Sequence, residues 1–152
     1  MIESSLLIRP FKEDDEEALV SLWKMCKLTV PWNDPYKDIA RKIKVQAELL
    51  LVGQLEDKLI ASVMAGYDGH RGWINYFAVH PEFQSRGYGK QLMDYVENRL
   101  RELGCPKINL QIREGNDKVF SYYQKLGFVE EKRANMGKRL EDDQLFLSLT
   151  AL

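Results

Sequence analysis

The chain has 152 residues, 45% of them hydrophobic and 30% charged, which is enough for one domain with a real core and predicts a single domain over residues 1–152. Its 22 basic and 23 acidic side chains leave a formal charge of −1, so the chain as a whole offers no cationic field to nucleic acid or to an anionic membrane. With two cysteines, no metal-ligand spacing and no run of ~20 apolar residues, we expect an unexported, cytoplasmic protein without a disulfide, a metal or a membrane span.

The first half of the chain alternates between strand-like and helix-like spacing of apolar residues. Residues 6–11 predict a short strand, and residues 13–26 an amphipathic helix with acids in its first turn. Two prolines and an Asn-Asp pair predict a loop over 27–36, followed by a helix over 36–47. Apolar runs at 49–55, 59–67 and 73–80 predict three antiparallel strands joined by turns.

The second half continues with a helix from Gly89 to Leu103 and a strand over 107–112. A strand reached through a helix is the connection that a parallel pair needs. Residues 116–128 predict another helix, and residues 128–132 and 134–140 a last hairpin. The apolar tail 141–152 suits packing on the domain or on a second subunit, as in a homodimer. The order predicts an α+β fold around a mixed sheet.

Two glycines precede the helix that begins near residue 89. The first four N–H groups of a helix lack intrahelical partners, and the helix dipole adds partial positive charge, so such an end favours an anion. Gly87 and Gly89 let a phosphate approach these amides, and Arg86 and Lys90 add charge. A pyrophosphate group is the expected ligand. The alternative is that the glycines only make a tight turn.

Two familiar phosphate loops do not match. A P-loop needs a glycine five residues before the Gly-Lys pair and a hydroxyl after it, where this chain has Gln84 and Gln91. A dinucleotide fingerprint needs a third glycine where Leu92 stands and an acidic residue at the end of the next strand, where only the distant Glu114 is found.

The pattern Gln84-x-x-Gly87-x-Gly89, after the strand "NYFAVHP", resembles the acetyl-coenzyme A signature of the GNAT superfamily of N-acetyltransferases. The second half of that family's pattern is also present, as Asn116, Tyr123 and the following "QKLGF". The resemblance extends from "LLIRPF" to "MGKRL" and is closest to the small bacterial acetyltransferases of the YpeA type, which share "PWNDP", "GYDGHRG", "VHPEF" and "GCPKI".

This resemblance implies a mostly antiparallel central sheet with helices on both faces and a splayed parallel strand pair. It implies direct transfer of acetyl from acetyl-coenzyme A to a primary amine on a protein, peptide or small molecule, with coenzyme A as product and no metal. The pantetheine arm would lie between residues 77–79 and 109–112, where separated strands expose N–H and C=O groups. The implied cofactor-binding residues are Phe77, Ala78, Val79, Gln84, Arg86, Gly87, Tyr88, Gly89, Lys90, Asn116 and Tyr123.

The resemblance also implies catalytic roles. Tyr123 matches a tyrosine that donates a proton to the departing thiolate, and its alternative is packing on a helix face. The backbone N–H of Val79 is placed to bond the thioester oxygen. Many family members carry a glutamate on the preceding strand as base, but "GWINYFAV" has no carboxylate. Asp68 and His70 are the nearest ionisable residues in sequence, and a chain of water molecules is the alternative.

The amine acceptor is expected at the loop "PWNDP" and the strand beside it. Trp32 is a candidate wall of the amine site or a core residue; Asn33 and Asp34 either contact the acceptor or cap the next helix. Tyr76 is the fourth candidate acceptor-binding residue. Because the usual glutamate is missing, a non-catalytic acyl-coenzyme A binding module with a regulatory role is the alternative to an enzyme.

Overall fold

The computed structural model describes residues 5–143, which form one five-stranded sheet in the order β1-β2-β3-β4-β5. The strands are β1 (Leu7–Pro10), β2 (Leu50–Leu55), β3 (Lys58–Tyr67), β4 (Gly72–Val79) and β5 (Ile108–Leu110). Neighbouring strands are antiparallel except β4 and β5, which are parallel. The predicted mixed α+β fold is therefore confirmed. No helix within the described residues is long and apolar enough to cross a membrane.

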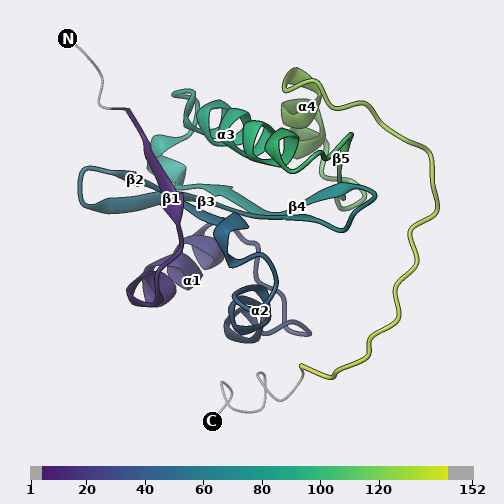
Figure 1. Cartoon of the computed structure of the whole chain (residues 1–152), viewed down its shortest axis with the longest axis horizontal. Helices are drawn as coiled ribbons and strands as arrows, with labels where there is room; N and C mark the ends of the chain where they lie inside the picture. The colour runs from purple at the N-terminus through teal and green to yellow at the C-terminus, as the bar shows by residue number, and fades with distance from the viewer. Residues whose placement is uncertain (1–4, 144–152) are drawn as a thin grey trace.

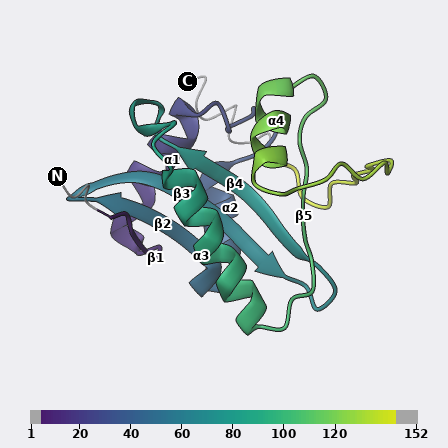
Figure 2. The same cartoon turned by 90° about the horizontal axis from the view of Figure 1, so that it is seen from above.

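Helices cover both faces of the sheet (Figures 1 and 2). The helices α1 (Glu16–Met25) and α2 (Pro35–Lys42) lie on one face, and α3 (Tyr88–Glu102) and α4 (Asp117–Lys125) on the other. Short 3-10 turns, η1 (Glu13–Asp15), η2 (Ala47–Leu49) and η3 (Pro81–Phe83), precede α1, β2 and the glycine loop. The sheet thus separates two layers, and the end of β4 borders both.

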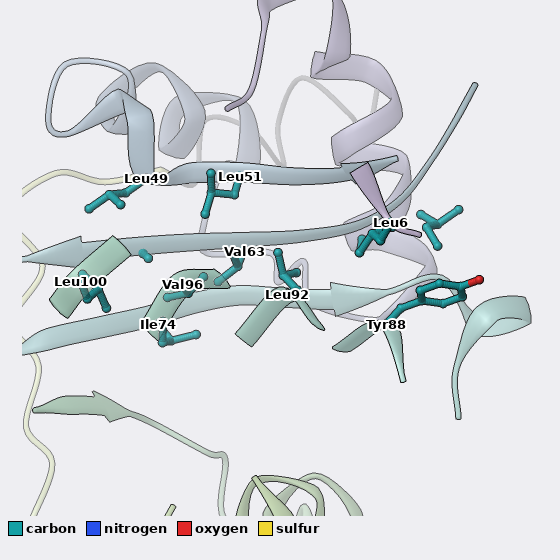
Figure 3. Close-up of a cluster of buried hydrophobic side chains, with 12 residues drawn as sticks. Leu6, Leu49, Leu51, Val63, Ile74, Tyr88, Leu92, Val96 and Leu100 are labelled. Atoms are coloured by element: carbon teal, nitrogen blue, oxygen red, sulfur yellow. The ribbon is translucent and has the colours of Figure 1, made fainter. Parts of the chain in front are cut away.

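Each layer has its own apolar core because the strands of a two-sided sheet carry apolar residues on both faces. Figure 3 shows the cluster under α3, where Leu92, Val96 and Leu100 recur every fourth residue and pack with Leu51 and Val63 of the sheet. Every one of these five side chains is at least 99% buried. The other face of the sheet has a second cluster, in which α1 and α2 pack against strand residues such as Leu50, Val52 and Ala78.

Two helix predictions differ from the structure at their ends. The helix expected over 13–26 begins as the 3-10 turn η1, and the one expected over 36–47 ends at Lys42. The second difference has a tertiary cause. Gln46 adopts a left-handed backbone, with φ of 55°, and its side-chain amide both accepts from the N–H and donates to the C=O of Tyr67. These bonds pull the chain out of the helix and onto the end of β3.

The predicted hairpin over 128–132 and 134–140 is wrong, because residues 128–140 contain no strand. Side chains rather than backbone groups tie this segment to β5: Glu131 accepts from Lys107 and Asn109, and Asn135 accepts from Gln111. The run "EEKR" keeps its charges in water instead of alternating with apolar residues, so a pleated partner for β5 does not form. The chain continues in a wide arc towards α2 (Figure 1). Most of the tail 141–152 lies outside the described residues.

Candidate active site

Strands β4 and β5 separate after Ile74, the third of the eight residues of β4. Their parallel pairing covers only Gly72 to Ile74 opposite Ile108 to Leu110, while β4 continues to Val79. The His80 N–H donates to the C=O of Ile60, so by antiparallel alternation the N–H and C=O of Val79 point away from β3. These two groups point into the space beside β4 where β5 no longer pairs with it. Polar backbone groups beside a gap of this kind bind an extended amide-containing chain as an added strand would.

A β-bulge lies in the separated part of β4. Between the pairs Ser62–Ala78 and Met64–Asn75, the two residues Tyr76 and Phe77 face one residue of β3. Tyr76 has a φ of 50°, which is a left-handed conformation that an aromatic residue rarely adopts. Such a residue costs about 1–3 kcal/mol and persists only where its surroundings fix it. The strained residue lies three positions before Val79.

The glycine loop joins the end of β4 to α3. Gly87 is the N-cap of α3 with a φ of 86°, and nothing lies within 4 Å of where its side chain would be. Arg86 and Lys90 flank it and are exposed. Because α3 is 15 residues long and nothing lies near Gly87, the amides of its first turn, the helix dipole and the exposed Arg86 meet at one place. The Lys90 ammonium group adds a second positive charge there and pairs with Asp94 at 2.9 Å. These residues fit a pyrophosphate group.

Gln84 ties this loop to the strand. Its side-chain amide donates a 2.9 Å hydrogen bond to the C=O of Val79, and the Cys26 thiol donates to the same oxygen at 3.3 Å. The outward carbonyl of Val79 is thereby satisfied. The N–H of Val79 is the other polar backbone group of this residue that is directed at the gap. The glutamine of the sequence motif therefore fixes the strand end from which the loop starts.

Gly89 is needed for a different reason from Gly87. A side chain at Gly89 would overlap the hydroxyl group of Tyr122, which comes from α4. The absence of a Cβ thus lets α4 approach the first turn of α3. Tyr88, beside it, is buried in the core under α3. The second glycine of the motif therefore serves the packing of two helices, while the first leaves space for a ligand.

Tyr123 lies on the same helix, close to the separated strands. Its ring centroid is 5.9 Å from that of Phe77 on β4 and 5.7 Å from that of Phe128. Burial raises the pKa of the Tyr123 phenol well above its usual value. The phenol therefore stays protonated at any physiological pH. Asn116 occupies the N-cap position of α4, but its exposed side chain makes no capping hydrogen bond.

The structure places Asp68 and His70 at the far end of β4 from the glycine loop. They lie in the β3–β4 turn, where the Asp68 carboxylate accepts from the N–H groups of His70 and Arg71. From Gly72 to Val79 the strand spans about 23 Å at ~3.3 Å per residue. Both side chains are exposed. Neither residue is brought to the gap between β4 and β5.

The loop 27–34 on the opposite face brings other side chains together. Trp32 is 51% exposed, so it is not a core residue, and the Arg113 guanidinium lies 5.7 Å from its ring centroid. Asp34 is 8% exposed and caps α2 by accepting from the N–H groups at 36 and 37. Asn33 instead reaches the sheet, where its amide donates to the Tyr76 hydroxyl at 2.9 Å.

Asp38, in the first turn of α2, is a site residue that no sequence motif indicated. Its carboxylate accepts from the Tyr76 hydroxyl at 2.6 Å, from the Asn33 amide, and from the Arg41 guanidinium at 2.9 Å. Burial and this carboxylate raise the pKa of Tyr76 above its ordinary value. Because Asp38 follows Asp34 by one helical turn, the sequence indicates that both side chains lie on the same side of α2. It does not indicate that Asp38 bonds Tyr76, which is 38 residues away in the chain.

The C-terminal segment contacts α2 and the residue that caps it, on the same face of the sheet. Asp143 is buried and accepts from the Arg41 guanidinium at 2.6 Å and from the N–H of Asp34 at 3.0 Å. The Arg41 guanidinium lowers the pKa of Asp143 to about 2. A shallow pocket of about 700 Å³ lies between Trp32, Arg41 and residues 137–141. A larger groove of about 1560 Å³ lies between β5 and residues 128–135; its lining includes His70, Asn116 and Tyr123 but no residue of the glycine loop.

Comparison with known proteins identifies the scaffold. The model of the Acetyltransferase (GNAT) family matches residues 15–128. The chain belongs to this family. An acetyltransferase of Pectobacterium atrosepticum is 45% identical over 137 residues, which are 90% of this chain and 97% of that protein. An acetyltransferase of Yersinia enterocolitica is 44% identical over the same shares. The narrower resemblance to the YpeA type stays a prediction.

Solved GNAT structures share the fold. The aminoglycoside acetyltransferase AAC(6')-Iy, in complex with a bisubstrate analogue of coenzyme A, superposes with a TM-score of 0.73 at 21% identity, over 90% of this chain and 99% of that one. Ard1 from Thermoplasma volcanium superposes with a TM-score of 0.71 at 22% identity, over 85% of this chain and 86% of that one. Family membership makes the protein an acyltransferase of the N-acetyltransferase class.

Proposed function

We propose that this GNAT acetyltransferase transfers acetyl directly from acetyl-coenzyme A to a primary amine. The observation that carries the proposal is the separation of β4 from β5 next to an open helix N-terminus. The gap begins after Ile74, and Gly87 caps α3 only eight residues beyond the strand's last residue. A molecule with a pyrophosphate joined to an amide-rich arm matches both features at once.

The geometry supports the following binding roles. The N–H groups at the start of α3, with Arg86 and Lys90, take the anionic end of the donor. The exposed edge of residues 77–79 takes the amide-rich arm. Acetyl-coenzyme A supplies an acyl group activated as a thioester. The N–H of Val79 then faces the position where negative charge develops as the amine attacks, and a fixed donor there lowers the barrier.

Tyr123 supplies the proton for the leaving group in this proposal. Its phenol remains protonated because burial raises its pKa, and its ring neighbours Phe77 in the separated part of β4. The transfer needs no protein nucleophile. The Cys26 thiol donates to the carbonyl of Val79, and burial raises its pKa, so it is held as a poor nucleophile.

The amine approaches from the face that holds α1 and α2. The exposed Trp32 and the half-buried Asn33 and Tyr76 are the side chains that we expect to line this approach. Asp34 is not available to attract a cation, because it is buried as the cap of α2. The acceptor's proton leaves through water in this proposal, since Asp68 and His70 lie at the other end of β4. Water returns a proton to the Tyr123 phenolate after the transfer.

The test combines two measurements on the purified wild-type protein. Calorimetric titration measures the affinity for coenzyme A, and release of free thiol from acetyl-coenzyme A is followed with peptides bearing a free amino terminus, lysine peptides, polyamines and amino acids. Binding with amine-dependent thiol release supports the proposal. Binding without release for every amine would favour a regulatory acyl-coenzyme A binding module, and no binding would contradict the role of the glycine loop.

A further inference from the structure

The strained residue Tyr76 is held from three sides. Its ring stacks on Trp23 of α1, with centroids 3.8 Å apart and an angle of 14° between planes. The buried Ser62 hydroxyl donates to the Tyr76 C=O at 3.0 Å and accepts from the Trp23 indole at 2.9 Å. These contacts fix the ring and the carbonyl of the bulge, and they come from α1 and β3.

The third contact comes from α2, which α1 neighbours on the same face of the sheet (Figure 1). The Tyr76 hydroxyl donates to the Asp38 carboxylate at 2.6 Å. Asp38 is itself fixed, because its other oxygen accepts from Arg41. A left-handed aromatic residue persists only where its surroundings over-determine it, so loss of one of the three contacts favours relaxation of its backbone towards a regular strand.

The position of the bulge gives this contact a consequence for the reaction. Tyr76 is the second residue beyond the last β4–β5 pair, and the residues that follow it carry the N–H of Val79 into the gap. A bulge changes which backbone groups of the next residues face each neighbour. If Tyr76 relaxed, the register of residues 77–79 against β3 would change, and the Val79 N–H would no longer point at the acyl group.

We propose that Asp38 is a positioning residue for acetyl transfer: through the Tyr76 hydroxyl it keeps the β4 bulge in the conformation that directs the Val79 N–H into the gap. The inference rests on the proposed function. Because Asp38 also accepts from Asn33 of the loop 27–34, one carboxylate joins the acceptor face to the acyl-binding edge. Asp38 does not touch the donor. It acts through Tyr76.

The experiment measures the donor's carbonyl group directly. Acetyl-coenzyme A labelled with ¹³C at the acetyl carbonyl is titrated into the protein without an acceptor, and its ¹³C resonance is followed by NMR. In the wild type the resonance moves downfield on binding, because a hydrogen bond polarises the carbonyl. We expect Asp38→Ala and Tyr76→Phe to lose most of this shift while the affinity for acetyl-coenzyme A changes less than about twofold.

The variants separate positioning from folding. Asp38→Asn keeps one oxygen that accepts from Tyr76 but loses the charge and the second acceptor, which Arg41 uses, so it retains more of the shift than Asp38→Ala. Glu102→Gln removes the carboxylate of an exposed pair with Arg99 at the same helical spacing as Asp38 and Arg41, and leaves the shift unchanged. Melting temperatures check that every variant is folded at the temperature of the titration.

Each outcome decides the matter. Loss of the shift in Asp38→Ala and Tyr76→Phe, with no further loss in the double variant, supports the inference because the two residues then act as one unit. An unchanged shift in both variants overturns it, and so does a loss of shift that only accompanies a parallel loss of affinity. A wild type that binds without any shift overturns the inference alone, whereas a wild type that does not bind acetyl-coenzyme A overturns the proposed function as well.

Discussion

The hydroxyl group of Tyr122 occupies the space that a side chain at Gly89 would fill. The two residues belong to α4 and to the first turn of α3, so this contact sets how closely the two helices approach. It also explains why two glycines of one short motif are not equivalent, since Gly87 borders open space.

Gly89→Ala is expected to destabilise the protein by about 1–3 kcal/mol, because the added methyl group forces Tyr122 out of its position. Removing the Tyr122 hydroxyl in a Tyr122→Phe background leaves room for that methyl group. The double variant should therefore be more stable than the sum of the two single effects predicts. Urea unfolding of the four proteins measures this, and strict additivity would contradict the contact.

Gly87→Val is expected to abolish measurable binding of coenzyme A and to cost about 1–2 kcal/mol of stability, because a β-branched residue resists a φ of 86° and blocks the open helix end. Gly104 is a matched control: it has a φ of 85° and open surroundings at the other end of α3. Gly104→Val should lose similar stability and keep its affinity in a calorimetric titration. Equal affinities of the two variants would show that the loop does not hold the donor.

Tyr123→Phe is expected to slow acetyl transfer by about 10²-fold or more while the affinity for coenzyme A stays within about twofold, because only a proton donor is lost. Tyr67→Phe, which removes an exposed hydroxyl from the end of β3, is the control. Steady-state rates and calorimetry measure the two quantities. A parallel loss of rate and affinity would assign Tyr123 to binding.

The same residue sets a pH dependence. A phenol donates below its pKa, and burial moves the pKa of Tyr123 upward from its usual value of ~10. Its protonated form therefore persists to higher pH, and the wild-type rate should not fall from about pH 8 to pH 10 on account of this group. A rate profile that declines through this range in the wild type but not in Tyr123→Phe would contradict the raised pKa.

Asp143 should contribute to stability only above acidic pH. Its pKa is lowered from 3.8 to about 2 in the folded protein, so its stabilisation is present above pH 3.8 and is lost as the pH falls towards 2. We expect about 1 kcal/mol, less than the shift alone implies, because water screens the partly exposed Arg41.

Thermal unfolding of wild type and Asp143→Asn at a series of pH values tests this expectation. The difference in stability between the two proteins should be largest at neutral pH and shrink as the pH falls below 4. Glu130→Gln, on an exposed side chain of the same C-terminal segment, is the control and should follow the wild type. A difference that stays constant down to pH 2 would show that the Arg41 contact does not depend on the charge of Asp143.

The sequence by itself located the elements and the glycine loop, because these depend on neighbours in the chain. The recurrence of Leu92, Val96 and Leu100 at helical spacing defined α3, and the glycines before it marked an open helix end. The motif that continues to Tyr123 placed α4 beside the loop. Such signals are local, and a helix or a left-handed glycine forms where the sequence favours it.

Only the tertiary structure decided which side chains meet. Tyr122 reaches Gly89, Gln46 holds Tyr67, and Asp38 fixes Tyr76, in each case between elements that the chain separates widely. The hairpin expected over 128–132 and 134–140 did not form, because the charged run "EEKR" has no apolar face to pack beside β5. Partner choice depends on the packing of whole layers, and no short pattern of residues encodes it.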